Sequence, residues 1–385
     1  MPPLEKFLFE LHTFLKDLPA VAAQHPLEGA RKLMKKDVAV PYSLPLPTEE
    51  TNWKVSFEPP SDISLVGSWA NKVCVKPKDG KKFGVDLAVE MPNVRASAHL
   101  LINTLTVQQA LFQEKDYLNG RFFHKRAFYL ATIAASIQKS KLGRKIDVYY
   151  ESLQGDSRLT KLILTPKSDG PSESTTDFSK LNAKVCILPV LSPNSPISLH
   201  RLSPSHSNIR INSSSDPSND EIKPSNHTPS PLYNNCLLQA VVPKPQLLAV
   251  HSLQNEVSSF SDALTLLRLW ANQHGYSEGT KICVRGFEGA GPWWWSLLAL
   301  LLNGEEARPG GPKSSKRKSV GKGLSSYQLF KAALEFLGAS QRLYLLTPSN
   351  WFSAKHDFSK DPVFSKSAEG HRVSTFRRAT DFPSY

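Results

Sequence analysis

Three features of the sequence predict an α+β fold. Short apolar runs of strand length lie between residues 54 and 191, and a long amphipathic stretch at 116–138 interrupts them. Beyond residue 258 the apolar residues instead recur at helical spacing. Strands mixed with helices, and then helices alone, indicate a mixed-sheet domain followed by a helical domain.

Composition narrows the function classes. The chain has 385 residues, of which 40% are hydrophobic, and a formal net charge of +13, which suits a globular protein with a polyanionic partner. The four cysteines form no Cys-x-x-Cys pair, so neither a disulfide framework nor a zinc ribbon is expected. Residues 1–20 contain acids among their apolar positions, so no secretory signal is expected there. The apolar run 293–302 has about half the length of a membrane span. We therefore expect a soluble intracellular protein without a membrane segment.

The first 52 residues predict an amphipathic helix at 4–18 and a proline-punctuated linker at 41–53. The mixed-sheet domain is then expected at 53–195. Its first predicted strands are KVSFE (54–58), ISLVGSW (63–69), KVCVK (72–76) and FGVDLAVEM (83–91). A glycine-serine turn at Gly67 and Ser68 is expected to open a helix. After the helix at 116–138, the remaining predicted strands are 145–153, 160–166 and 183–191.

The second half of the chain changes character twice. Residues 196–235 are rich in Ser, Pro and Asn and predict a disordered insertion, because they bury too little apolar surface to offset their ordering entropy. A helical domain is expected at 236–345, and an uncertain, truncated or aberrant tail at 346–385. Helices are predicted at 258–276, 286–302 and 324–340.

Three consecutive tryptophans, Trp293, Trp294 and Trp295, open the most apolar of these helices. They favour packing in a core or an interface over stacking on nucleic-acid bases.

Several motifs in a fixed order carry a family resemblance. VDLAVEMP (85–92) and FQEKDYLNGRFFHKRAFYLATIA (112–134) come first. They are followed by FSDALTLLRLWANQHG (260–275), GFEG (286–289) and LSSYQLFKAALEFLG (324–338). Together they resemble the N-terminal part of the Nrap family of nucleolar RNA-associated proteins, over roughly residues 50–340. Two stretches depart from the family pattern, 94–109 and 365–385.

The resemblance implies a nucleotidyltransferase-like domain followed by a helical domain like that of poly(A) polymerase and oligoadenylate synthetase. It also implies a nuclear, nucleolar protein of the small-subunit processome, the assembly that matures pre-ribosomal RNA. The expected partners are pre-ribosomal or small nucleolar RNA, contacted through phosphates, and other processome proteins. Family members are much longer than this chain.

The acids decide whether such a domain can be catalytic. Nucleotidyl transfer with two metal ions needs a glycine-serine turn, two acids one residue apart on a strand, and a third acid on a neighbouring strand. Gly67, Ser68 and Asp86 match, but Ala88 occupies the second acidic position. Glu90 lies about 7 Å beyond Ala88 at strand rise. We therefore expect a degenerate site, with no enzymatic activity, no metal and no cofactor.

Clusters of basic residues predict contact with RNA phosphates. The candidates for RNA contact are Lys72, Lys76, Lys78, Lys81 and Lys82, then Arg121, Lys125 and Arg126, and finally Lys313, Lys316, Arg317, Lys318 and Lys322. Each cluster is also consistent with a solvated surface, and His124, Lys125 and Arg126 with anchoring of their helix to neighbouring acids. The sequence thus predicts a non-catalytic scaffold in ribosome biogenesis. The alternatives are an active metal-dependent RNA nucleotidyltransferase using Asp86 and Glu90, and an assembly module that contacts protein alone.

Overall fold

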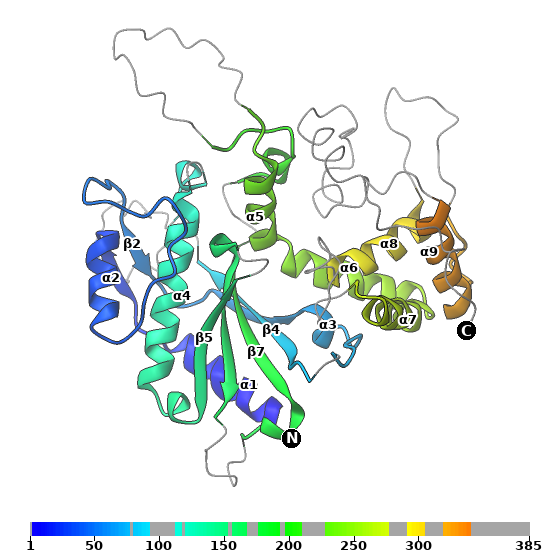
Figure 1. The fold of residues 1–385 in the computed structure, drawn as a ribbon, viewed down its shortest axis with the longest axis horizontal. Coiled ribbons are helices and arrows are strands. Elements are labelled where there is room, and N and C mark those ends of the chain that lie inside the picture. Colours follow the sequence, from blue (N-terminus) through cyan, green and yellow to red (C-terminus); the bar gives the residue numbers. More distant parts are fainter. Residues whose placement is uncertain are drawn as a thin grey trace, which may run out of the picture. The chain divides into compact units, whose positions relative to one another are not determined.

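The computed structural model comprises two compact units, residues 1–66 with 82–243, and residues 67–81 with 244–385 (Figure 1). It describes residues 2–77, 80–92, 112–117, 120–152, 156–167, 176–192, 197–209, 228–276, 291–304 and 319–339. Residues 67–81 and 236–243 lie in a different unit from the one in which the predicted domain boundaries place them.

A five-stranded mixed sheet forms the centre of the first unit. Its strands, in spatial order, are β3 (Asp62–Val66), β4 (Phe83–Met91), β7 (Ala183–Leu191), β6 (Thr160–Pro166) and β5 (Ile146–Ser152). Only β4 and β7 pair in parallel, and the other neighbours are antiparallel. Alternating β-branched and aliphatic residues bury Val85, Leu87 and Val89 on one face of β4.

The long helix α4 (Arg121–Lys139) is buried along most of its length and contacts β5, β6 and β7. It also packs on α2 (Pro26–Met34) and on β2 (Val55–Phe57), which pairs with β1 (Val21–Gln24) in a small second sheet. A Cβ atom on Gly29 would lie 2.7 Å from the Phe128 ring, so glycine permits the close approach of α2 to α4. Helix α1 (Pro3–Lys16) buries its leucine face in the same unit.

Short 3₁₀ turns lie at Glu114–Asp116, Leu142–Arg144, Ser157–Leu159, Ser179–Leu181 and Leu199–Leu202.

The prediction of disorder across 196–235 is wrong at both ends of this segment. Residues 197–209 pack against α5 (Pro231–Val241), and Leu202 is buried. The Asn234 amide donates to the carbonyls of Ser203 and His206, at 2.8 Å each, and accepts from Asn208 at 2.7 Å. These bonds satisfy the polar backbone that the low apolar content leaves uncovered. Residues 210–227 lie outside the described part.

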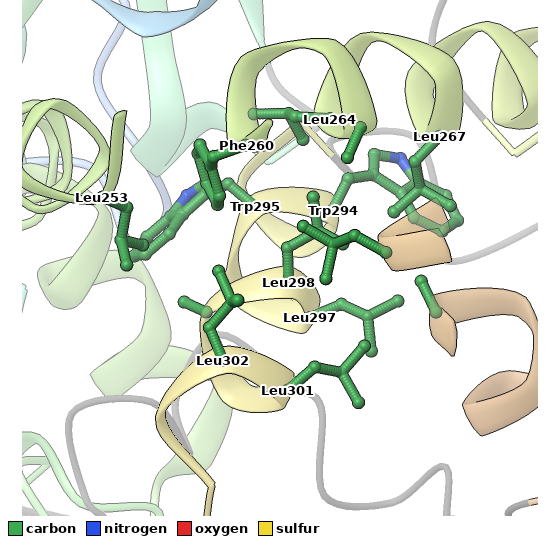
Figure 2. Close-up of a cluster of buried hydrophobic side chains, with 14 of the residues drawn as sticks. Leu253, Phe260, Leu264, Leu267, Trp294, Trp295, Leu297, Leu298, Leu301 and Leu302 are labelled. Carbon is green, nitrogen blue, oxygen red and sulfur yellow. The ribbon is translucent and has the colours of Figure 1, made fainter. Parts of the chain in front are cut away.

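The second unit is helical. It contains α3 (Gly67–Ala70), α6 (Pro243–Glu256) from Lys244 on, α7 (Phe260–Gln273), α8 (Gly291–Asn303) and α9 (Ser326–Ala339). Figure 2 shows its core, in which Trp294, Trp295 and the leucines of α8 meet Phe260, Leu264 and Leu267 of α7. Trp294 is 2% exposed and Trp295 is 4% exposed. The expectation that the tryptophans pack rather than stack on bases is confirmed for these two residues.

Most predicted elements are present, but the strand predicted at 72–76 is wrong. Residues 71–77 have no regular structure, because side chains rather than a neighbouring strand bind their carbonyls. Arg268 donates to the Val73 carbonyl at 2.8 Å, and Asn272 to that of Lys76 at 3.3 Å. Helices α2, α5 and α6 were not predicted. The segments 94–109 and 346–385 lie outside the described residues.

Candidate functional site

The face of the sheet that carries Asp86 is the candidate site. Strand alternation puts Gly84, Asp86, Ala88 and Glu90 on one face of β4. Asp86 is half-buried, whereas Glu90 is 7% exposed and accepts a hydrogen bond from the Ser61 hydroxyl at 2.8 Å. Glu90 is thus hydrogen-bonded to the residue that precedes β3.

The strands on either side of β4 determine what surrounds Asp86. Asp86 pairs with Val66 on β3 and with Cys186 on β7. Ala88 pairs with Ser64 and Leu188. Cross-strand partners share a face, so a second or third carboxylate beside Asp86 would have to come from these positions. They instead supply apolar groups, a thiol and a hydroxyl.

A lysine–glutamate cluster lies on the same face, beyond Cys186. The Lys184 ammonium is 2.5 Å from a Glu151 carboxylate oxygen on β5, and the Lys161 ammonium is 3.8 Å from the other oxygen. Burial raises the pKa of Glu151, but hydrogen bonds and charge from Lys184 and Lys161 outweigh it, so the pKa is lowered overall. Glu151, one of the acids that β5 contributes to this face, is therefore neutralised by two cations.

The thiol on the strand next to Asp86 belongs to Cys186 and is buried. Burial, reinforced by the negative charge of Asp86, raises the pKa of the Cys186 thiol to about 12. The thiol is therefore protonated at neutral pH, and metals bind the thiolate form. Among the described residues, no group of three or more His, Cys, Asp or Glu side chains is placed to hold a metal ion.

The glycine-serine turn has the predicted local structure. Gly67 follows Val66, the partner of Asp86, directly in the chain, and its φ of 75° is in the left-handed region that favours glycine. Ser68 lies in the single turn of helix α3, and its carbonyl accepts a hydrogen bond from the backbone N–H of Val73 at 2.9 Å. Gly67 and Ser68 belong to the helical unit and Asp86 to the sheet unit.

The first basic cluster is at the surface. Lys72, Lys76, Lys81 and Lys82 are exposed, and Lys78 lies outside the described residues. Lys72 and Lys76 lie in the irregular segment 71–77, in which α7 binds two carbonyls, whereas Lys82 belongs to the sheet unit. The cluster therefore has the exposure that contact with phosphates requires.

The basic residues of α4 differ from one another. Arg121 is half-buried in the first turn, and Lys125 forms an ion pair with Asp116 at 2.7 Å. Arg126 is 7% exposed and donates to the carbonyls of Pro189, Arg158 and Thr160 at 3.3, 3.2 and 2.7 Å.

Burial lowers the pKa of Arg126 to about 10, so the guanidinium stays charged at neutral pH. The expectation that Arg126 contacts RNA is therefore wrong. Its charge satisfies backbone carbonyls inside the sheet unit.

His124 also anchors α4. Its ring stacks on Trp53 with centroids 5.3 Å apart, and its Nε2 is 3.0 Å from the Ser43 carbonyl. Burial lowers the pKa of His124 despite this hydrogen bond. The alternative prediction, anchoring of α4, therefore fits His124 and Arg126, although their partners are carbonyls rather than acids. Only Lys125 has the predicted acidic partner.

The second basic loop is represented by one described residue. Lys322 is exposed and forms an ion pair with Glu256 at 2.7 Å. The other candidates, Lys313, Lys316, Arg317 and Lys318, lie outside the described residues.

Sequence inspection missed a lysine-lined pocket of about 630 Å³ in the sheet unit. Its walls come from β1, α2 and α4, and its lysines are Lys32, Lys36, Lys54 and Lys139. Lys32 lies in α2 and Lys36 in the turn that follows it, whereas Lys54 and Lys139 join them only through the tertiary fold. The part of the chain that the structure describes has no helix long and apolar enough to cross a bilayer.

Comparisons with known proteins agree with this architecture. A family model described as Nrap protein domain 1 matches residues 23–95 and 103–256. A second, described as the Nrap protein PAP/OAS-like domain, matches residues 259–381. The gap between the two matched parts of the first domain falls within 94–109, the first stretch that departs from the family pattern. The second match includes most of the tail that the sequence led us to regard as aberrant.

Individual relatives support the same assignment. U3 small nucleolar RNA-associated protein 22 of Saccharomyces cerevisiae is 30% identical over 341 residues, covering 87% of this chain and 25% of the relative. The protein of that name from Schizosaccharomyces pombe is 30% identical over 346 residues, covering 87% and 27%. Nucleolar protein 6 of Xenopus laevis is 28% identical over 337 residues, covering 88% and 24%. The chain thus spans about a quarter of the length of these curated relatives. It belongs to the Nrap family.

Proposed function

We propose that this chain is a non-catalytic scaffold that contacts RNA phosphates and protein partners during nucleolar pre-ribosomal RNA processing in the small-subunit processome. Relatives named as associated with U3 small nucleolar RNA, or as nucleolar, support this setting. The nucleolar location expected from the resemblance agrees with these names. The net charge of +13 favours a polyanionic partner.

The side chains that surround Asp86 support the non-catalytic part of the proposal. Two-metal chemistry needs several carboxylates within reach of both ions. The positions around Asp86 hold Ala88, Cys186 and Leu188, and the acid across the sheet, Glu151, is engaged by two lysines. The positions that pair directly with Asp86, Val66 and Cys186, contribute no second carboxylate.

The RNA contact is assigned to the exposed basic segment of Lys72, Lys76, Lys81 and Lys82. Lysines on irregular segments neutralise phosphates without reading base sequence. Arg268 and Asn272 bind the carbonyls of Val73 and Lys76, so the backbone next to Lys72 and at Lys76 is held in place. This arrangement suits a subunit that binds folded RNA within an assembly.

Crosslinking of RNA in living cells tests the proposal. The chain should crosslink to pre-ribosomal or small nucleolar RNA, and replacing Lys72, Lys76, Lys81 and Lys82 with Gln should reduce the yield several-fold at unchanged protein level. Replacing the exposed lysines Lys16, Lys115, Lys141 and Lys180 is the matched control. Unchanged crosslinking in the first variant would instead favour a module that contacts protein alone.

A further inference from the structure

The lysine-lined pocket of the sheet unit has the charge pattern of a binding site. Its lining includes four lysines and a single glutamate, Glu28. Glu28 is already paired with Lys32, whose ammonium lies 2.7 Å away. The three other lysines, Lys36, Lys54 and Lys139, are exposed and have no ion pair with any described residue. The pocket therefore presents three uncompensated positive charges.

The floor between these lysines is apolar. It includes Val21 and Ala22 from β1, Leu33 from α2 and Ala135 from α4. Its volume of about 630 Å³ is within the range of roughly 300–1,000 Å³ typical of small-ligand sites. Apolar side chains and ammonium groups in one lining suit a ligand with a flat, weakly polar part and several negative charges.

The rim of the pocket also contains a buried polar group without a partner. His25 Nδ1 accepts a hydrogen bond from the backbone N–H of Leu27 at 3.3 Å, which leaves the proton of the neutral ring on Nε2. Nε2 is buried and has no hydrogen-bond partner among the described residues. A buried donor of this kind is usually explained by a bound water, ion or ligand.

The pocket has a fixed shape because of how α2 meets α4. Gly29 lies against Phe128, where a Cβ atom would come within 2.7 Å of the ring, and Gln24 of β1 accepts a hydrogen bond from Lys32 at 2.8 Å. The three unpaired lysines therefore come from three separate parts of the chain: Lys36 from the turn after α2, Lys54 from the residue before β2, and Lys139 from the end of α4.

We propose that this pocket binds single-stranded RNA, with one nucleotide on the apolar floor and successive phosphates at Lys36, Lys54 and Lys139. A duplex carries its phosphates on a convex surface that cannot enter a pocket, whereas an unpaired nucleotide can. The net charge of +13 and the names of the relatives favour RNA over an acidic peptide. The inference rests on the proposed RNA contact but places it outside the basic segment around Lys72.

Fluorescence anisotropy with a labelled ten-nucleotide oligouridylate and the full 385-residue chain tests the proposal. The variant Lys36→Gln, Lys54→Gln, Lys139→Gln should weaken binding about tenfold or more. It should also reduce the slope of log affinity against log salt by about 2, at roughly 0.7 for each lost contact to a single strand. The matched control, Lys16→Gln, Lys141→Gln, Lys180→Gln, removes the same charge from exposed sites outside the pocket and should change affinity less than about twofold.

The other outcomes separate this inference from the proposed function. If the unmodified chain binds no oligouridylate, both the RNA contact and the pocket assignment are overturned. If it binds, but the pocket and control variants weaken binding equally, only the pocket assignment fails. A ten-residue polyglutamate that binds as tightly as the RNA, and is equally sensitive to the pocket variant, would show that the site takes acidic peptides and would overturn the proposal. Both variants should keep the circular dichroism spectrum of the unmodified chain, since all six lysines are exposed.

Discussion

Arg126 offers a sharp test of the distinction between structural and RNA-contacting basic residues. Replacing Arg126 with Met keeps much of the side-chain volume but removes all three hydrogen bonds to carbonyls. The bond to the Arg158 carbonyl is partly solvated, so water can replace it. The bonds to Pro189 and Thr160 are buried, and the loss of their donor leaves two acceptors unsatisfied.

The cost follows from these two acceptors. An unsatisfied buried acceptor costs about 1–3 kcal/mol, so the two together cost about 2–6 kcal/mol. Removing a desolvated charge offsets part of this cost, because burial disfavours the charged form of Arg126. We expect the sheet unit to lose about 2–4 kcal/mol of stability.

Hydrogen exchange measured by mass spectrometry is the appropriate assay, because a chain with two compact units has no single free energy of unfolding. Peptides from α4, β6 and β7 should show the decrease in opening free energy. Arg121→Met, in the first turn of the same helix, should change it by less than about 0.5 kcal/mol. A loss below about 1 kcal/mol for Arg126→Met, or one no larger than for Arg121→Met, would refute the structural role.

Three further substitutions test other parts of the structure. In a thermal-shift measurement, Trp294→Ala should destabilise the helical unit by about 3–5 kcal/mol, because it leaves a cavity in the core. The control Leu269→Ala should cost far less, because the Leu269 side chain is 41% exposed. Asn234→Ala should speed limited proteolysis within 197–209, because it removes the hydrogen bonds that hold this segment. The control Leu232→Ala, on the exposed face of α5, should leave the rate unchanged. Equal rates for the two variants would contradict the proposed role of Asn234 in ordering the segment. Lys184→Met should raise the pKa of Glu151 in a carboxylate NMR titration. Because the pKa of Glu151 is lowered in the folded chain, its stabilising contribution is present above its unfolded pKa and is lost as the pH falls through the folded pKa. That acid-dependent loss should shrink in Lys184→Met but not in Lys180→Met.

The sequence predicts elements well where local periodicity and burial agree. The alternation of FGVDLAVEM and the apolar stripe of 116–138 correspond to β4 and α4. The strand predicted at 72–76 has the same alternation as β4, yet its backbone is held by side chains of α7, a long-range contact that no local pattern encodes. Residues 197–209 likewise have the composition of a disordered segment, but the buried amide of Asn234 orders them.

The candidate site likewise has features that follow from the local sequence pattern and features that depend on long-range contacts. The absence of a second acid could be read from Ala88 alone, because the two-residue strand period fixes which positions share a face. The Glu151–Lys184 pair could not, since it depends on β5, β6 and β7 lying side by side in a particular register. The presence of basic residues in the sequence also failed to separate the buried Arg126 from exposed candidates such as Lys72 and Lys76, because burial is a property of the whole fold.

The central claim is that the Asp86 face supports no metal-dependent nucleotidyl transfer. Its most direct test is the incorporation of labelled nucleoside triphosphates into single-stranded RNA by the purified chain, with Mg²⁺ or Mn²⁺, alongside Asp86→Ala. The account predicts that neither protein incorporates label above a reaction without protein. Incorporation by the unmodified chain that Asp86→Ala abolishes would contradict it.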